Sequence, residues 1–330
     1  MEKISCIFCG AKNSDVAITE KGFTGLRCAR CELIYISPRP GASEVTRLYT
    51  DEHAVLYADA QFQFDGFNRM EAARALATIG AYRKGGSILE LGAGGGCFLS
   101  EARRLGYEPH GIELNPIEAR WINEKLHIPC EARELSERSF EGKRFDIIYH
   151  RDVLSHLSDP ISTFREMHRA LKDDGLVVFE TGNIADVRPE YMKHFSQFSY
   201  PDHLFFFGER SIGLLLERTG FSCLHVQKQG ILLPLLLQKV FWGAKDSLKD
   251  PKAANEMRLR EDGNSEAPGL SLKRRLRLLY RYAKHYLGRL GGALPTEGRP
   301  LKLVVIAQRG TEKEASLEAT AGTKEERYAN

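Results

Sequence analysis

The sequence lacks a long run of apolar residues. Its longest run, ILLPLLL at residues 231–237, contains a proline and is far shorter than the roughly 20 apolar residues that a membrane-spanning helix needs. The first residues, MEKISCIFCG, lack an apolar core followed by a small-residue cleavage site, so we expect no signal peptide and a cytoplasmic location. Charges nearly balance, with 47 Lys and Arg against 44 Asp and Glu, and this balance alone indicates no class of partner.

Two common nucleotide-binding motifs are missing from the glycine-rich stretch ILELGAGGGC at residues 88–97. A dinucleotide motif that starts at Gly92 needs a third glycine at position 97, where the chain has Cys97. A P-loop needs a Gly-Lys-Ser/Thr ending, which is also missing. The stretch instead reads Glu90-x-Gly92-x-Gly94-x-Gly96 directly after an apolar strand. Such glycines let the backbone pass close beneath a ligand without phosphate at that point, and the acid can pair with a cationic amino group.

The cysteines are few and unevenly placed. Four of the seven form two C-x-x-C pairs that are separated by eighteen residues. Without an export signal, this spacing indicates metal ligation and excludes a disulfide scaffold. Four thiolates complete a tetrahedral zinc site with no open position, so the metal is expected to be structural. We predict a zinc ribbon over residues 1–40 with the ligands Cys6, Cys9, Cys28 and Cys31. The other three, Cys97, Cys130 and Cys223, are expected to be core residues.

Strand and helix patterns alternate from Ser87 onward. Apolar strands separated by helices of about ten residues predict a parallel sheet with helices on both faces. Strands are expected at 87–91, 109–114, 129–132, 145–150, 175–181, 221–227 and 301–309, and helices at 67–82, 97–105, 116–126, 160–171 and 211–220. The predicted units after the ribbon are a helical connector and cofactor lid at 41–85, a sheet domain at 86–229 and 301–310, a helical insertion at 230–300, and a disordered tail at 311–330.

Acids stand at the ends of two further strands. Glu113 closes the second strand, about twenty residues after the glycine loop, where an acid accepts hydrogen bonds from ribose hydroxyls. This feature fits either a dinucleotide or a nucleoside ligand. Glu134 follows the third strand, where an acid could accept the exocyclic amino group of adenine, with the amide of Leu135 nearby.

These segments resemble the class I S-adenosylmethionine-dependent methyltransferases. ILELGAGGG, GIEL, FDIIYHRDVLSHLSDP, LKDDGLVVFETGN and LLERTGF occur in that family's order, over roughly 86–226 and 301–309. The resemblance implies a Rossmann-like α/β fold with a seven-stranded sheet whose last strand is antiparallel, and S-adenosyl-L-methionine as cofactor. The N-terminal part looks like a bacterial subfamily that has a zinc ribbon and acts on sugars, glycans or secondary metabolites. The cofactor-binding candidates are Glu90, Gly92, Ala93, Gly94, Gly96, Glu113, Leu114, Glu134, Leu135 and His150.

Three histidines are candidates for a general base, which a hydroxyl or acidic C–H acceptor would require. His150 follows the fourth strand and is either a substrate contact or a wall of the ligand pocket. His156 lies in the same block and is either a base or a packing residue, and Ser155 replaces the glutamate that the family often has before it. His203 lies in an aromatic segment, 192–211, that resembles the family's substrate-covering insertion; its alternative role is to fix the loop. Tyr49 and Tyr57 either close over the methionine end of the cofactor or pack the connector.

Residues 270–292 form a basic amphipathic pattern. They hold seven Lys and Arg and no acid, with apolar residues near helical spacing. Such a helix contacts an anionic membrane, covers the sheet as a lid, or contacts RNA. The leading hypothesis is a peripheral enzyme that methylates a small molecule, a sugar or glycan, or a lipid-linked acceptor. The alternatives are an RNA methyltransferase and a non-catalytic S-adenosylmethionine-binding or scaffold protein. The ribbon has few basic residues interleaved with aromatics, which makes nucleic acid the less favoured partner.

Overall fold

The computed structural model describes residues 1–12, 15–50, 65–192, 195, 198–230 and 297–310. The predicted basic helix at 270–292, the tail at 311–330 and Tyr57 lie outside the described residues. None of the helices in the described ranges is both long enough and apolar enough to cross a membrane.

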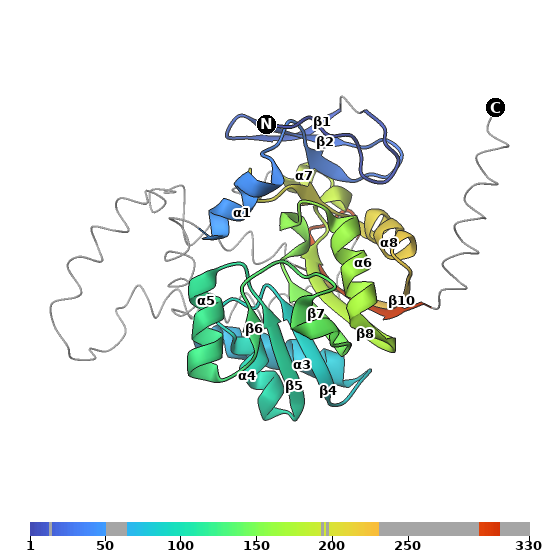
Figure 1. Cartoon of the computed structure of the whole chain (residues 1–330). Coiled ribbons are helices and arrows are strands. Elements are labelled where there is room, and N and C mark those ends of the chain that lie inside the picture. The colour runs from blue at the N-terminus through green and yellow to red at the C-terminus, as the bar shows by residue number, and fades with distance from the viewer. Residues whose placement is uncertain (13–14, 51–64, 193–194, 196–197, 231–296, 311–330) are drawn as a thin grey trace, which may run out of the picture.

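A seven-stranded sheet forms the centre of the molecule (Figure 1), in the order β10-β11-β8-β7-β4-β5-β6. Neighbouring strands from β8 to β6 are parallel, whereas β11 is antiparallel to both β10 and β8. This confirms the predicted fold class, a sheet with an antiparallel last strand. The strands are β4 (Gly86–Leu91), β5 (Tyr107–Ile112), β6 (Cys130–Glu131), β7 (Phe145–Arg151), β8 (Leu171–Gly182), β10 (Phe221–Gly230) and β11 (Leu301–Arg309).

Helices cover both faces of the sheet. Apolar residues of α3 (Asp65–Gly80), α4 (Cys97–Arg104) and α5 (Pro116–Trp121) pack on one face, in a core that contains Ile88 and Ile147. Those of α6 (Pro160–Ala170) and α8 (Glu209–Arg218) pack on the other face, in a core that contains Leu89 and Phe179. Successive side chains of a strand point to opposite faces, so in β7 Ile147 and Tyr149 lie in the first core and Ile148 lies in the second.

Local sequence explains where two of these helices begin. Asn115 precedes Pro116, and its side chain accepts a hydrogen bond from the Ile117 amide at 3.0 Å. Asp159 precedes Pro160 and caps α6 in the same way. A polar cap satisfies an amide that has no partner in the first turn, and proline at the first helical position loses nothing, since its missing amide would be unpaired there.

The predicted helix at 116–126 is α-helical only to Trp121, and a π-helical turn, Ile122–Leu126, completes it. The Asn123 side chain explains the change, because its amide donates to the carbonyls of Ala119 and Cys130 and accepts from the Cys130 amide. These bonds tie the end of the helix to β6. Cys130 is buried as expected, Cys97 is only partly buried, and Cys223 is exposed because it lies on the edge strand β10.

The N-terminal ribbon lies beside α7 (Pro189–Met192), at the top of the view in Figure 1. It contains β1 (Val16–Glu20), β2 (Phe23–Arg27) and β3 (Ile34–Ile36), and α1 (Ala42–Thr50) follows. A fourth strand of this sheet, β9 (Phe205–Phe206), comes from the aromatic segment far along the chain and pairs with β3. The ribbon sheet, in the order β1-β2-β3-β9, thus joins two segments that the sequence assigned to separate units.

Candidate active site

The glycine loop ties the carboxyl end of β4 to that of β5. The amides of Gly92 and Ala93 both donate to the carbonyl of Ile112, at 2.8 and 3.2 Å. Gly92 has a φ of 72°, and a Cβ added there would lie 2.7 Å from Cγ2 of Val153. Glycine is therefore required at this position, both for the left-handed backbone and for the close approach of the loop that follows β7.

Glu113 organises the loop from the end of β5. Its carboxylate is buried and accepts the amide of Gly94 at 2.8 Å on Oε2 and the amide of Asn115 at 2.9 Å on Oε1. Burial raises the pKa of Glu113, and the backbone amides partly oppose that shift. Each carboxylate oxygen has a second lone pair, so the same side chain can still accept hydrogen bonds from a ligand's hydroxyl groups.

Glu90 lies at the end of β4 and is buried. Its Oε2 atom has no hydrogen-bond partner among the described residues. Burial raises the pKa of Glu90 well above its usual value, the nearby Arg151 opposes this, and Glu113 adds to it. A buried acid without a partner is costly unless a ligand satisfies it. A cationic amino group would do so, and pairing with such a group is the role predicted for Glu90.

The third strand places a different acid at its end. Glu134 is exposed, whereas Leu135 is buried. The strand-end residue is Glu131, whose Oε1 accepts the Phe140 amide at 2.7 Å. Its Oε2 is buried, has no hydrogen-bond partner in the part of the chain that the structure describes, and lies 3.9 Å from Nε of Arg133. Glu118 on α5 is a further buried acid that the sequence reasoning missed; burial, and secondarily Glu113, raise its pKa to about 8. Its sequence signal was faint, since a single acid in the first turn of a helix usually faces solvent.

His150 points away from the loop. The strand β7 ends at Arg151, so His150 is inside it, fully buried against Phe164 and Phe179 on the face that α6 covers. Neither ring nitrogen has a hydrogen-bond partner among the described residues, and burial lowers its pKa to about 3. In this structure His150 has the place of a core residue, and its predicted catalytic and cofactor contacts gain no support from its surroundings.

The other two histidines lie together with an acid and a tyrosine, a set that we call the histidine cluster: Tyr49, His156, Asp202 and His203. The rings of His156 and His203 have centroids 4.5 Å apart. The His156 Nδ1 atom lies 3.1 Å from Oδ1 of Asp202 and 2.9 Å from the hydroxyl of Tyr49, which also donates to Asp202. Tyr49 was expected at the cofactor or in packing, and it instead completes this cluster.

The histidine cluster can move a proton. An acid beside Nδ1 of His156 favours the tautomer in which Nδ1 carries hydrogen, so that Nε2 is available as a base. Burial, and then the neighbouring His156, lower the pKa of His203 to about 4, which keeps its ring neutral at physiological pH. The same three side chains, His156, Asp202 and His203, also have their donor atoms within 4.8 Å of one another, and a divalent cation would compete for them.

The cluster lies on the same edge of the sheet as the glycine loop. His156 ends a short helical turn, Leu154–His156, that directly follows β7. In that connection Val153 packs on Gly92, and the charge of Asp152 acts on His203. Asp152 itself has a φ of 56° and donates its amide to the carbonyl of Glu180 at 3.0 Å. A non-glycine residue in this conformation is uncommon, and aspartate is among the residue types that adopt it most readily.

A buried network of charges supports this edge on the α3 side. Glu180 is fully buried and binds Arg74 at 2.6 Å, Lys302 at 2.5 Å and the Tyr149 hydroxyl at 2.9 Å. Glu71 lies within 4 Å of the same two cations and of Arg151. Although burial alone would raise it, Lys302 and Arg74 lower the pKa of Glu180 to about 2. The network joins α3, β7, β8 and β11 where the strands carry the candidate site.

The four cysteines of the ribbon form a second centre. The sulfur atoms of Cys6, Cys9, Cys28 and Cys31 all lie within 4.8 Å of one another, and those of Cys9 and Cys28 are 3.4 Å apart. Four sulfurs about 2.3 Å from a zinc ion are roughly 3.8 Å apart, so the cluster fits a tetrahedral metal. Each pair lies in a tight turn, in which the Gly10 amide donates to the Cys6 carbonyl and the Glu32 amide to that of Cys28.

Burial raises the pKa of the Cys28 thiol, but the backbone amides of Cys31 and Arg30 outweigh it and lower the pKa to about 7. Burial raises the pKa of Cys6 to about 11, and burial together with the neighbouring thiols raises that of Cys31 further. One thiol of the cluster is therefore readily deprotonated, and a bound cation would be needed to ionise the others.

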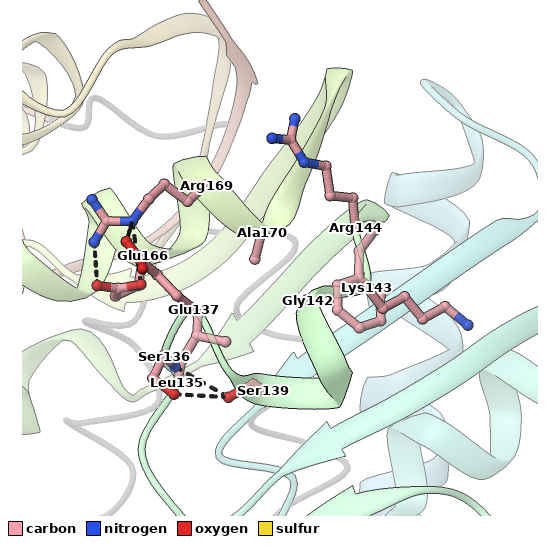
Figure 2. Close-up of a pocket in the computed structure, with 11 residues that line it drawn as sticks. Leu135, Ser136, Glu137, Ser139, Gly142, Lys143, Arg144, Glu166, Arg169 and Ala170 are labelled. Carbon is pink, nitrogen blue, oxygen red and sulfur yellow. Dashed lines mark hydrogen bonds and ion pairs between the residues drawn. The ribbon is translucent and has the colours of Figure 1, made fainter.

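The structure also contains a cavity of about 240 Å³, which Figure 2 shows with its lining residues. It is bounded by residues 135–145 and the end of α6, and of the candidate residues only Leu135 lines it. Its cations are already paired, since Arg169 binds Glu166 and Glu137, and Arg144 lies 3.6 Å from Asp173. The cavity is therefore not the predicted ligand site.

Comparison with known proteins identifies the sheet domain. Residues 64–226 match the model of a family described as "Methyltransferase domain". This stretch, just under half of the chain, is similar to a methyltransferase domain. The chain is 26% identical over 179 residues to the ubiquinone biosynthesis O-methyltransferase of Ruegeria sp. (strain TM1040), covering 48% of this chain and 68% of that protein.

Two further matches are to phosphoethanolamine N-methyltransferases. Identity is 24% over 160 residues to phosphoethanolamine N-methyltransferase 2 of Caenorhabditis elegans, covering 46% of this chain and 36% of that protein. The solved structure of the Haemonchus contortus phosphoethanolamine N-methyltransferase 2 with S-adenosyl-L-methionine superposes with a TM-score of 0.51 and 17% identity, over 84% of this chain and 62% of that chain. The match thus spans little more than a third of the Caenorhabditis elegans protein. The structural match shows that the sheet domain has the fold of the Haemonchus contortus enzyme.

Proposed function

We propose that this protein transfers a methyl group from S-adenosyl-L-methionine to a small-molecule acceptor that loses a proton in the reaction. The observation that carries the proposal is that the glycine loop and the histidine cluster share one edge of the sheet of a methyltransferase domain. The relatives named above are, by their names, an O-methyltransferase of ubiquinone biosynthesis and a phosphoethanolamine N-methyltransferase, which supports a small acceptor.

The cofactor's place follows from the acids. Glu90, whose buried Oε2 has no hydrogen-bond partner within the described ranges, would pair with the amino group of the cofactor's methionine part, and Glu113 would accept the ribose hydroxyls. The adenine would lie near Leu135, with Glu131 at the strand end better placed than the exposed Glu134 to accept its amino group. When bound, the cofactor supplies a sulfonium methyl group that is already electrophilic. The chain's own task is to orient the acceptor and exclude water.

The histidine cluster would take the acceptor's proton. Asp202 fixes the tautomer of His156 through Nδ1, which leaves Nε2 to accept a proton from a hydroxyl or an acidic C–H. The neutral ring of His203 lies against His156 and can hold or relay that proton. An acceptor that carries no exchangeable proton would have no need of this arrangement.

Cofactor binding is tested by calorimetry with S-adenosylmethionine. Glu113→Ala should weaken binding about 30-fold or more, since it removes charge-assisted hydrogen bonds worth roughly 1.5–3 kcal/mol each. Glu131→Gln should weaken binding several-fold, whereas Glu134→Gln, a matched change at an exposed side chain, should leave it unchanged. Failure of the wild-type protein to bind S-adenosylmethionine would sink the proposal.

Acceptor chemistry is tested by incubating cell extracts with a labelled methyl donor and identifying labelled products by mass spectrometry. With the acceptor in hand, His156→Ala and His203→Ala should each lower turnover more than tenfold. His150→Phe serves as the control, because its ring packs in the core. If neither cluster variant loses turnover, the cluster is not the base.

We also propose that the four ribbon cysteines hold a structural zinc ion, which the spacing of their sulfur atoms supports. Metal analysis of the purified protein should find about one zinc per chain. The glycan or lipid-linked acceptor and the membrane contact through 270–292 stay predictions. Flotation with anionic vesicles decides the membrane contact: wild type should float, and neutralising Arg274, Arg275 and Arg277 should abolish flotation.

A further inference from the structure

The hairpin tip of the ribbon binds the segment 198–200, which precedes Asp202 and His203 of the histidine cluster, through hydrogen bonds that we call the grip. Glu20, the last residue of β1, accepts the amide of Phe198 at 2.9 Å on one carboxylate oxygen and the amide of Tyr200 at 2.7 Å on the other. Lys21, next in the chain, donates to the carbonyl of Tyr200 at 3.3 Å. Two successive charged side chains, Glu20 and Lys21, therefore bind two amides and one carbonyl of a segment that lies about 180 positions further along the chain.

The geometry of the β1–β2 hairpin keeps Glu20 and Lys21 in place. The two residues between β1 and β2, Lys21 and Gly22, have φ angles of 51° and 80°, the left-handed pair that a tight two-residue hairpin requires. On the neighbouring strand, a Cβ added to Gly25 would lie 2.1 Å from the hydroxyl oxygen of Tyr200. The Tyr200 side chain is 1% exposed, so the ribbon surrounds this residue from its backbone to its ring tip.

The gripped segment in turn holds the cluster. Ser199, between the two amides that Glu20 binds, has a φ of 62°. Its carbonyl accepts the amides of Asp202 at 2.9 Å and His203 at 3.0 Å. A serine in the left-handed region is strained and persists only where its surroundings fix it. Glu20 provides that constraint, because it binds the amide on either side of Ser199.

We propose that Glu20 is a positioning residue for methyl transfer: by fixing the turn at Ser199 it sets where Asp202 and His203 stand relative to His156. The inference rests on the proposed function, but its first step concerns only the fold. The Phe198 backbone also acts on the His203 ring, whose pKa it raises, so the same segment influences the side chain. The ribbon thereby becomes one wall of the acceptor site, and its role is more than that of a separately folded appendage.

Hydrogen exchange of the full-length, metal-loaded protein tests the first step. Glu20→Gln leaves only one acceptor oxygen for two amides, so the amides of residues 198–206 should exchange at least tenfold faster. Asp15→Asn, the same change at an exposed ribbon side chain, should have no effect. Gly25→Ala, which displaces Tyr200 without changing charge, should reproduce the Glu20→Gln result. Unchanged exchange in both Glu20→Gln and Gly25→Ala, with zinc content and circular dichroism intact, would overturn the grip.

Kinetics and NMR test the second step. In Glu20→Gln we expect turnover to fall at least tenfold while the KM for S-adenosylmethionine changes less than twofold, and the pKa of His203 to rise toward its ordinary value as the ring loses its fixed surroundings. A merely structural Glu20 would leave this split and this titration unchanged, and that result would overturn positioning even if exchange increased. A wild type without methyl transfer would refute the proposed function, while the exchange experiment would still decide the grip.

Discussion

Replacing Glu180 by glutamine should destabilise the fold by about 3 kcal/mol. This side chain has no exposed surface and is bound by Arg74, Lys302 and Tyr149. Its pKa falls from an ordinary value of 4.5 to about 2. The difference, 4.5 − 2 = 2.5, corresponds to about 3 kcal/mol at roughly 1.4 kcal/mol per pKa unit. Glutamine keeps the shape but removes the anion that lies closest to both cations and leaves them only the more distant Glu71. The expected loss is of the size measured for broken buried pairs, roughly 3–5 kcal/mol.

The pH dependence gives a second signature. Because the folded-state pKa of Glu180 lies below the unfolded one, the stabilisation is fully present above pH 4.5 and is lost as the pH falls from 4.5 toward 2. Urea denaturation followed by circular dichroism should therefore show a large difference between wild type and Glu180→Gln at pH 7 and a smaller one at pH 3. Asp173→Asn, at a side chain that is 94% exposed beside Arg309, should cost less than about 0.5 kcal/mol. A loss below 1 kcal/mol for Glu180→Gln, or a loss that is the same at both pH values, would refute the reasoning.

Three further changes have distinct expected outcomes. His150→Phe should leave the free energy of unfolding equal or raise it by about 1 kcal/mol, since two ring nitrogens without a hydrogen-bond partner among the described residues leave the core. Wild type should lose stability as the pH falls from 6.5 toward 3, because His150 has its pKa lowered to about 3 in the folded state. The variant should lack this loss, as chemical denaturation across that pH range would show. Gly92→Ala should weaken S-adenosylmethionine binding at least tenfold in calorimetry, because its Cβ meets Val153, whereas Gly106→Ala, with a similar φ of 86° and open space, should leave binding unchanged; equal effects would refute the clash. Cys28→Ser should abolish zinc binding in metal analysis and lower the thermal midpoint, and a fully loaded, equally stable variant would contradict the four-thiolate site.

The fold was largely predictable because its signals are local. The strands β4, β5 and β7 are each followed by a helix, and Asn115 and Asp159 cap two of these helices. The expected strand at 301–309 coincides with β11. The errors lie where burial depends on distant partners. Cys223 was expected in the core, but no sequence pattern reveals that β10 is an edge strand whose residues 222–225 are exposed.

The site was predictable only in part, for a related reason. Glu113 and the glycine loop lie at strand ends, and topology alone brings strand ends together. The union of Tyr49 with His156 and Asp202 depends on side chains from three separate segments, and the two-residue strand β9 is too short to leave a periodic signal. His150 was placed wrongly at the end of a correctly predicted strand. The strand was expected to end at residue 150, but β7 continues to Arg151, and this places the His150 ring in the core and away from the site.

The place of β11 in the sheet has a consequence for synthesis of the chain. Val304 pairs with Glu180 on one side and with Gln227 on the other, so an inner position of the sheet is filled by a segment translated long after both its neighbours. Until residue 309 has left the ribosome, β8 presents an open edge, and the Lys302 that neutralises Glu180 is missing. Such edges invite pairing with other chains, and contacts this distant in sequence form slowly. The nascent protein should therefore need protection from aggregation late in translation, when most of its core already exists.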